Sequence, residues 1–284
     1  MLKSKVDEVL KDINKLPAIS SVVSKVLEKL QKPDVNITDL AAEISKDPAI
    51  TASVIKLSNS AYYRASKPVR TVQEALMTLG TKTVKEIVLL TAAKGILSQD
   101  LSSYQIEAAQ LWTSSLLVAE LSSKIVLHKK LKVDKDLAFT SGLLCNVGKI
   151  VLAQFFSPVM MQIKTDLKEN KEPFPLLEKK YFGYTHMEIS KTLLEKWNFP
   201  EELVDVVTNY LNPDLSTVNP LLTSVVHIAT ILIIVSGIGI DIGGETTPIS
   251  PFALSQTGIT DEDIQTYFLH IPDLQAGLAD LLNI

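Results

Sequence analysis

Apolar residues recur every three or four positions along almost the whole chain, and this period constrains the fold more than any other feature of the sequence. It is clear at Val6, Val9, Leu10 and Ile13, and it resumes over residues 22–30. A period of 3.6 residues is typical of an α-helix with one buried face, whereas a half-buried strand alternates with a period of two. No alternating run competes with the helical pattern. We therefore predict an all-α fold.

The predicted helices have clear starting signals. Three segments carry a polar residue followed three positions later by an acidic one, the pattern of a capping box that satisfies the free amide groups of a first helical turn. Asp47 stands before Pro48, and proline is tolerated at the first helical position because the N–H that it lacks would have no partner there. Proline and glycine breakers divide the rest of the chain into about a dozen helices. The three capping boxes are Asn36 with Asp39, Thr71 with Glu74, and Thr260 with Asp263.

The length and composition of the chain allow one large domain or two small ones, since 46% of its 284 residues are hydrophobic. The segment Ser98–Ser103 interrupts the apolar pattern, so we expect an N-terminal bundle over residues 1–103 and a second bundle over residues 104–284. The single cysteine, Cys145, cannot form an internal disulfide, and the chain begins with an amphipathic helical pattern rather than a signal segment. We expect a cytoplasmic protein.

Charge is distributed unevenly. The net charge is −4, but the last lysine or arginine is Lys196, and residues 197–284 hold eleven acidic residues. This acidic third could steer a basic partner, or it could be a solvated acidic face. The basic residues before it are dispersed lysines with only two arginines, Arg64 and Arg70, so we expect no nucleic-acid binding.

A succession of short motifs runs through the chain. In the first half they are Leu16–Ile19, Ser45–Ala52, Leu57–Tyr63, Lys67–Val72 and Leu79–Gly80. In the second half they are Leu111–Ser115, Ser141–Leu152, Tyr181–His186, Trp197–Pro200 and Val226–Thr230. In this order and spacing the motifs resemble the HDOD domain, the HD-related output domain of bacterial signalling proteins, over nearly the whole chain. The resemblance implies an HD-domain-like helical bundle preceded by an N-terminal helical bundle.

Enzymes of the HD superfamily hold a divalent metal that activates water, and the resemblance implies which positions of this chain would bind it. The residues there are Ser114, Cys145, Asn146 and Thr230, where the family pattern has histidine or aspartate. Without an anionic oxygen at Asn146, a hard cation loses its main electrostatic anchor. We therefore expect no catalytic residues, no bound metal and no other cofactor.

Two histidines remain at family positions, His186 and His227, and with the four replaced positions they define a vestigial pocket. Cysteine and histidine can bind a soft ion such as zinc, and a pocket could accept a small effector. Alternatively, Cys145 packs as a small apolar residue and the other side chains satisfy buried polar groups. The six residues of the vestigial pocket are Ser114, Cys145, Asn146, His186, His227 and Thr230.

Three functional hypotheses follow from the resemblance and its departures. The first is a non-catalytic bacterial signalling or regulatory module, a stand-alone HDOD protein that binds a protein partner or a small signal in trans. The second is a divergent metal-dependent phosphohydrolase or phosphodiesterase that acts on a nucleotide through a ligand set around His186. The third is a sensor that binds a nucleotide without hydrolysing it. Replacement of four ligand positions favours the first, because it removes both the charge and the geometry of a metal site.

A corner after the Leu57–Tyr63 motif is a candidate partner surface, comprising Asn59, Tyr62, Tyr63 and Arg64. Tyrosine and arginine are frequent anchors in protein interfaces. Alternatively, Asn59 caps the end of a helix, and the two tyrosines seal the junction between the bundles.

Residues 221–240 are a run of twenty without Asp, Glu, Lys or Arg, long enough to cross a bilayer. No lysine or arginine flanks the run, and His227 and Gly237 interrupt its apolar character. A large all-α core needs a helix that is hydrophobic all round. We therefore expect a buried helix and no membrane segment.

Overall fold

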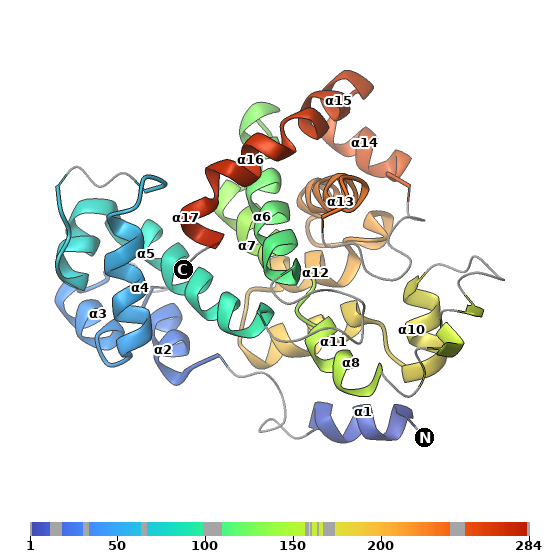
Figure 1. The fold of residues 1–284 in the computed structure, drawn as a ribbon, viewed down its shortest axis with the longest axis horizontal. Helices are drawn as coiled ribbons and strands as arrows, with labels where there is room; N and C mark the ends of the chain where they lie inside the picture. Colours follow the sequence, from blue (N-terminus) through green and yellow to red (C-terminus); the bar gives the residue numbers. More distant parts are fainter. Residues whose placement is uncertain are drawn as a thin grey trace. The chain divides into compact units, whose positions relative to one another are not determined.

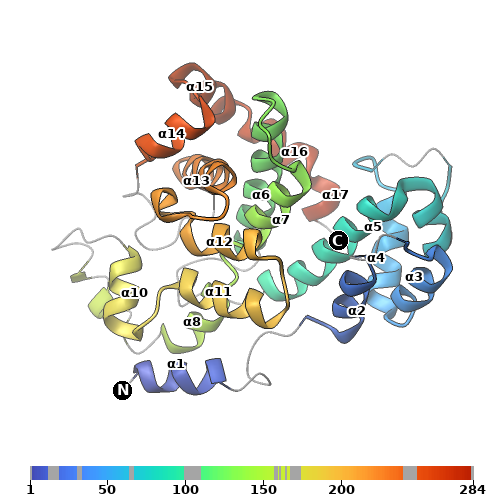
Figure 2. The same cartoon turned by 180° about the vertical axis from the view of Figure 1, so that it is seen from behind.

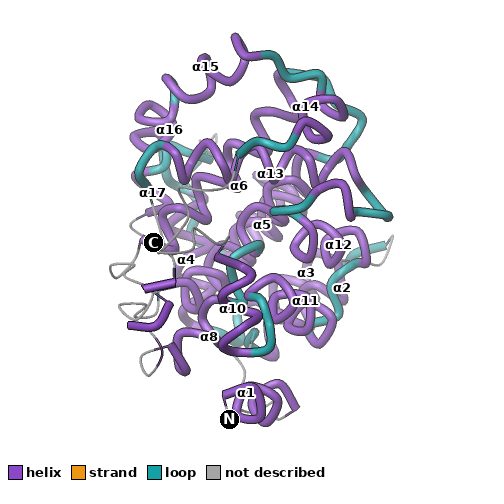
Figure 3. The backbone as a smooth tube through the Cα atoms, turned by 90° about the vertical axis from the view of Figure 1, so that its right-hand side faces the viewer, coloured by secondary structure: helices purple, strands orange, loops and turns teal. Residues whose placement is uncertain are grey.

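A computed structural model describes most of the chain. It covers residues 2–11, 19–30, 34–63, 67–98, 110–156, 159, 161–163, 165–166, 174–238 and 248–282. Within these ranges every regular element is a helix (Figures 1 and 3), which confirms the predicted all-α fold. The residues cluster into two compact units, each built from two stretches of the chain.

The smaller unit comprises residues 18–95 and 275–284. The amphipathic period predicted for its first helices buries Val26 of α2 and Ile44 of α3, and these two helices pack together. Helix α5 bends at Gly80, whose φ of 82° is accessible to glycine without strain. The helices are α2 (Ser21–Leu30), α3 (Ile37–Ile44), α4 (Pro48–Ser58), α5 (Val72–Leu97, whose last two residues fall in the larger unit) and α17 (Ala279–Leu282).

The predicted helix starts are largely confirmed. Asn36 accepts a hydrogen bond from the amide of Asp39, which is the first half of the predicted box, and Asp47 accepts from two amides at the start of α4. Thr260 and Asp263 form a complete capping box. At Thr71 half of the predicted box forms: the Thr71 hydroxyl accepts from the N3 amide, but the N3 carboxylate accepts from the amide one residue before Thr71.

The larger unit comprises residues 1–17 and 96–274, and α13 runs through its centre. Helices α6, α7, α12 and α14 pack on α13, which is seen end-on in Figures 1 and 2. Residues 222–233 are all buried, which confirms the predicted buried helix over these residues, whereas Val235 at the end of α13 is 62% exposed. The helices are α1 (Leu2–Lys11), α6 (Gln110–His128), α7 (Lys135–Leu144), α8 (Lys149–Phe156), α10 (Phe174–Phe182), α11 (His186–Lys196), α12 (Glu201–Asn209), η4 (Pro213–Leu215), α13 (Pro220–Val235), α14 (Pro251–Thr257), α15 (Asp261–Leu269) and α16 (Ile271–Gly277).

Helix α7 lies very close to α6. A Cβ atom added to Gly142 of α7 would lie 2.9 Å from the Cα atom of Ala119 of α6, closer than real Cβ contacts. The two small residues therefore allow the backbones to approach, and this contact fixes the end of α7, where the Cys-Asn pair follows.

The predicted boundary after residue 103 lies outside the described residues and stays a prediction. The two units do not correspond to a division of the chain at one position, because each combines two separate stretches. Helix α1 groups with the larger unit because it packs on α8 and α10 and because the Tyr184 hydroxyl donates to Asp7 at 2.5 Å. Residues 275–284 group with the smaller unit, where the Asp280 carboxylate accepts from the amide of Ala61 at 2.9 Å.

One helical segment among the described residues is long and apolar enough to cross a membrane by these two criteria alone. This segment is Lys135–Ala153, which comprises α7, the turn after it and part of α8. In its most apolar stretch, 78% is buried inside the structure. Such burial is typical of a core helix.

Candidate functional site

The Cys-Asn pair lies in the turn between α7 and α8, and both Cys145 and Asn146 are buried there. The turn is fixed to the first half of α11, since the amide of Gly148 donates to Ser190 Oγ at 2.9 Å and that hydroxyl donates to the carbonyl of Cys145 at 3.2 Å. A Cβ atom on Gly148 would lie 2.0 Å from the carbonyl oxygen of His186. Glycine is therefore required here, and it brings Asn146 close to the start of α11.

Tyr210 joins the turn to α11. Its hydroxyl donates to Asn146 Oδ1 at 3.1 Å and shares a hydrogen bond of 2.7 Å with His186 Nε2. All three side chains are buried. The Tyr210 hydroxyl therefore lies between two of the residues that the vestigial-pocket hypothesis groups together.

Glu178 of α10 extends this chain of hydrogen bonds. One carboxylate oxygen accepts from the backbone amide of His186 at 3.0 Å and bonds with Nδ1 of the same ring at 2.6 Å. Both side chains are buried. Both ring nitrogens of His186 are thus bonded to protein atoms, Glu178 on one side and Tyr210 on the other.

His227 of α13 is held in one tautomer. The amide of Ser250 donates to Nε2 at 2.9 Å, so that nitrogen carries no proton, and Nδ1 donates to the carbonyl of Tyr210 at 2.8 Å. Burial lowers the pKa of His227, and the hydrogen bond to the Tyr210 carbonyl opposes this change. The ring is a neutral link between α13 and the residue after α12.

Cys145 carries a protonated thiol. Burial raises its pKa to about 12, outweighing the charge of Lys149 and a hydrogen bond with Thr230, which both act to lower it. The sulfur donates to the carbonyl of Gly142 at 3.2 Å and accepts from Asn146 Nδ2 at 3.5 Å. Thiolate is the form that binds metal, so this sulfur is a poor ligand at neutral pH.

The six residues of the vestigial pocket are therefore only partly brought together. Asn146 and His186 meet through Tyr210, Cys145 contacts Asn146 and Thr230, and His227 reaches the backbone of Tyr210. The Thr230 hydroxyl also donates to the carbonyl four residues earlier, and the buried Ser114 hydroxyl donates to the carbonyl of Leu111 within α6.

These residues do not fit an HD-type divalent metal. A hard cation needs several oxygen ligands with negative charge. The carboxylate that the structure places in this cluster, Glu178, is bonded to His186. Among the described residues, no group of three or more His, Cys, Asp or Glu side chains is arranged to hold a metal ion.

Two residues of the cluster, Tyr210 and Glu178, do not belong to the predicted site. Glu178 carries a sequence signal, because it shares one face of α10 with the buried Phe174, Leu177 and Phe182, and an acidic residue on an apolar face needs a partner. Tyr210 lies just beyond the α12 pattern and carries no such signal.

Three residues of the predicted partner corner, Asn59, Tyr62 and Tyr63, are among the described residues. Asn59 is exposed, and it donates to the carbonyl of Val69 and accepts from the Val69 amide, both at 2.8 Å. The half-buried Tyr62 and Tyr63 rings meet edge to face at 4.8 Å, and the Tyr63 hydroxyl donates to Glu86 at 2.9 Å. The alternative role of Asn59 is also present, since it caps α4. Arg64 lies outside the described residues.

Solved structures share this fold. An HDOD domain protein with unknown function from Geobacter sulfurreducens is 21% identical, with a TM-score of 0.72 over 99% of this chain and 98% of that one. A protein from Shewanella amazonensis SB2B, provisionally named a phosphohydrolase, is 21% identical, with a TM-score of 0.65 over 98% of this chain and 91% of that one. At these identities the similarity shows the fold alone.

An uncharacterized protein of Treponema pallidum (strain Nichols) is 24% identical over 203 residues, which are 70% of this chain and 38% of that protein. The chain thus spans less than half the length of this relative. The HDOD domain model matches residues 16–213, well over half of the sequence and the part that holds the Asn146–Tyr210–His186 cluster. The chain belongs to the HDOD domain family.

Proposed function

We propose that this chain is a non-catalytic signalling module of the bacterial cytoplasm that acts by binding a protein partner. The observation that carries the proposal is the Tyr210 hydroxyl, which is bonded to both Asn146 and His186. The polar atoms at the former ligand positions thus stabilise the fold. Membership of the HDOD family supports an output role, because the resemblance is to the output domain of signalling proteins.

Metal binding at this cluster would have to compete with folding. Asn146 and His186 would exchange their bonds to Tyr210 for bonds to the ion, and Cys145 would lose a proton from a thiol whose pKa is raised to about 12. Ligands bind metal in deprotonated form, so each of these requirements lowers the affinity. The same reasoning counts against a phosphohydrolase that uses these residues.

The Asn59–Tyr63 loop is our candidate for the partner surface. Its two aromatic rings are half-buried, and the loop is closed by Asn59 and by the contact of Ala61 with Asp280. Aromatic side chains held in a fixed geometry lose little entropy on binding, which favours them as interface anchors.

The first test is elemental analysis of tag-free protein dialysed against trace manganese, iron and zinc, with His186→Ala as the matched control. We expect less than about a tenth of an equivalent of metal in both proteins. About one equivalent in the wild type and none in His186→Ala would overturn the proposal and support the divergent phosphohydrolase.

A second test distinguishes the proposed module from the alternative, a sensor that binds a nucleotide. Thermal unfolding is followed with and without a panel of mononucleotides and cyclic dinucleotides, together with a phosphodiesterase assay. A ligand that binds the folded state at 100 times its Kd would add about 2.7 kcal/mol to the free energy of unfolding. No shift and no turnover are expected, and a saturable shift without turnover would instead identify a nucleotide sensor.

A further inference from the structure

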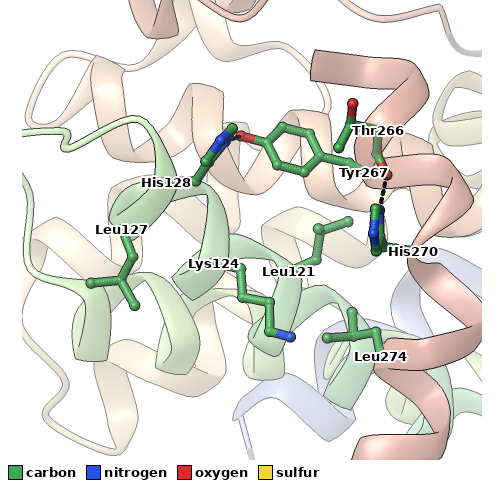
Figure 4. Close-up of a pocket in the computed structure, with 8 residues that line it drawn as sticks. All are labelled: Leu121, Lys124, Leu127, His128, Thr266, Tyr267, His270 and Leu274. Atoms are coloured by element: carbon green, nitrogen blue, oxygen red, sulfur yellow. Dashed lines mark hydrogen bonds between the residues drawn. The ribbon is translucent and has the colours of Figure 1, made fainter. Parts of the chain in front are cut away.

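The four histidines of the chain fall into two pairs. His186 and His227 are buried, and every one of their ring nitrogens is bonded to protein atoms. His128 and His270 are exposed, and both line one cavity of about 370 Å³ in the larger unit (Figure 4). The cavity therefore gathers both surface imidazoles of the chain.

The floor of this cavity is apolar and buried. It is formed by Leu121 of α6, the ring of Tyr267 of α15 and Leu274 of α16. A volume of about 370 Å³ lies at the lower end of the range for small-molecule sites, about 300–1,000 Å³. The floor thus offers an apolar surface that fits a small organic molecule.

The rim of the cavity is basic. Lys124 contributes an ammonium group, and His128 and His270 contribute imidazoles, whereas no acidic residue is among the eight described residues that line it. This contrasts with residues 197–284, which hold no lysine or arginine and eleven acidic residues. The rim therefore brings Lys124 and His128 of α6 next to His270, which belongs to that acidic third.

Nearby carboxylates do not neutralise the rim. Asp263 is held by Lys129 at 2.8 Å and closes the capping box of α15. Glu120 approaches Lys124 only at 3.9 Å, and the Lys124 side chain is 54% exposed. An exposed pair at this distance is weak, so the ammonium group is available to a ligand.

The imidazoles are oriented by the fold. His128 Nδ1 bonds with the Tyr267 hydroxyl at 2.8 Å, and burial raises the pKa of that tyrosine to about 12, so it keeps its proton. His270 Nδ1 donates to the carbonyl of Thr266 at 2.7 Å, which leaves Nε2 for another partner. Figure 4 shows Lys124 and His270 around the same space as Leu121. Fixed polar groups beside an apolar floor are typical of a ligand site.

We propose that this cavity binds a small carboxylate with an apolar body. The carboxylate would lie between Lys124 and His270, and the apolar body would cover Leu121 and Leu274. The ammonium group of Lys124 selects an anion, and the floor selects an apolar chain or ring over a strongly polar body such as a nucleotide. The cavity is separate from the hydrogen-bonded cluster of Asn146, Tyr210, His186 and Glu178, here called the Tyr210 cluster. The inference therefore does not depend on the proposed signalling function.

The test is a titration of the intact protein with octanoate, followed by calorimetry and by the imidazole NMR signals of His128 and His270. Acetate and octylammonium serve as comparison probes, the first without the apolar body and the second with the opposite charge. We expect saturable 1:1 binding of octanoate, at least tenfold weaker binding of both comparison probes, and shifted signals from both imidazoles.

Two variants assign the binding to the cavity. Lys124→Met is expected to weaken octanoate binding about fivefold. Lys191→Met is the matched control, because Lys191 is 49% exposed and also lies four positions from a glutamate, 4.0 Å from Glu195; it should leave binding unchanged. Thr266→Trp, which places a large ring in the cavity from an exposed position, should abolish binding.

Three results would overturn the proposal. They are no saturable binding of octanoate, equal binding of octanoate and octylammonium, and an equal loss in Lys124→Met and Lys191→Met. The second would mean that apolar contact alone drives binding, and the third that the effect is general screening of charge.

Discussion

The Tyr210 cluster and the α6–α15–α16 cavity hold the same kinds of side chain in opposite surroundings. In the cluster, His186 is buried and both of its ring nitrogens bond with protein atoms. At the cavity, His270 is exposed, and among the described residues only its Nδ1 atom is hydrogen-bonded. A polar group whose bonds are completed inside the protein stabilises the fold, whereas a group with an open position beside an apolar surface is available to a ligand. The residues Asn146 and His186, at positions where the resemblance implies metal ligands, are part of the core.

Removing His186 should have the largest effect. His186→Leu leaves the buried Glu178 carboxylate without its ring partner, and we expect a loss of about 3 kcal/mol in the free energy of unfolding. Urea unfolding followed by circular dichroism measures it.

A paired variant distinguishes the lost bond from the lost volume. In His186→Leu with Glu178→Leu no carboxylate is left behind, so the double variant should be more stable than His186→Leu alone. A single variant within about 0.5 kcal/mol of the wild type would show that the cluster contributes little to folding.

Removing the Tyr210 hydroxyl should have the next largest effect. Tyr210→Phe keeps the ring but leaves Asn146 Oδ1 and His186 Nε2 without their shared partner, and we expect a loss of about 2 kcal/mol. The same unfolding experiment measures it. The exposed-lysine variant Lys191→Met is the control, and equal stability of the two variants would contradict the role assigned to Tyr210.

The contrast between the two regions also separates what the sequence can predict from what it cannot. The period of 3.6 predicts α13 as a buried helix, and the Asp47-Pro48 and Thr260–Asp263 signals predict helix starts, because these depend on residues close together in the chain. The replaced ligand positions are equally visible in the sequence.

The partners of those positions are not visible in the sequence. Tyr210 reaches Asn146 across 64 positions of the chain, and Lys124 and His270 line one cavity only because the fold brings α6 beside the end of α15. Such pairs depend on how helices pack, and packing is not determined by local period or propensity. Residue types predict that a buried polar group has a partner, but not which one.

The pH dependence of stability tests the neutral state of His227. Burial lowers its pKa in the folded protein, so below the ordinary histidine pKa near 6.5 the unfolded chain binds a proton first. The stability that neutral His227 contributes is therefore fully present above pH 6.5, and it is lost as the pH falls through the pKa of His227 in the folded protein. One such group contributes a slope of at most about 1.4 kcal/mol per pH unit.

The measurement compares unfolding free energies of the wild type and His227→Gln between pH 7.5 and pH 5. The variant lacks the titrating ring, so the difference between the two proteins should shrink as the pH falls. A difference that stays constant over this range would contradict the assignment.

The smallest expected effect is at the cavity, and it completes the contrast. Lys124→Met removes an exposed ammonium group that is 3.9 Å from Glu120, so the free energy of unfolding without ligand should change by less than about 0.5 kcal/mol. The same variant should bind octanoate about fivefold more weakly. A substitution that leaves the free energy of unfolding unchanged but weakens binding identifies a polar group that contacts the ligand. His186→Leu should instead lower the free energy of unfolding and leave octanoate binding unchanged. If Lys124→Met instead destabilised the fold by more than 1 kcal/mol, the ammonium group would belong to the structure, and the two regions would no longer differ in kind.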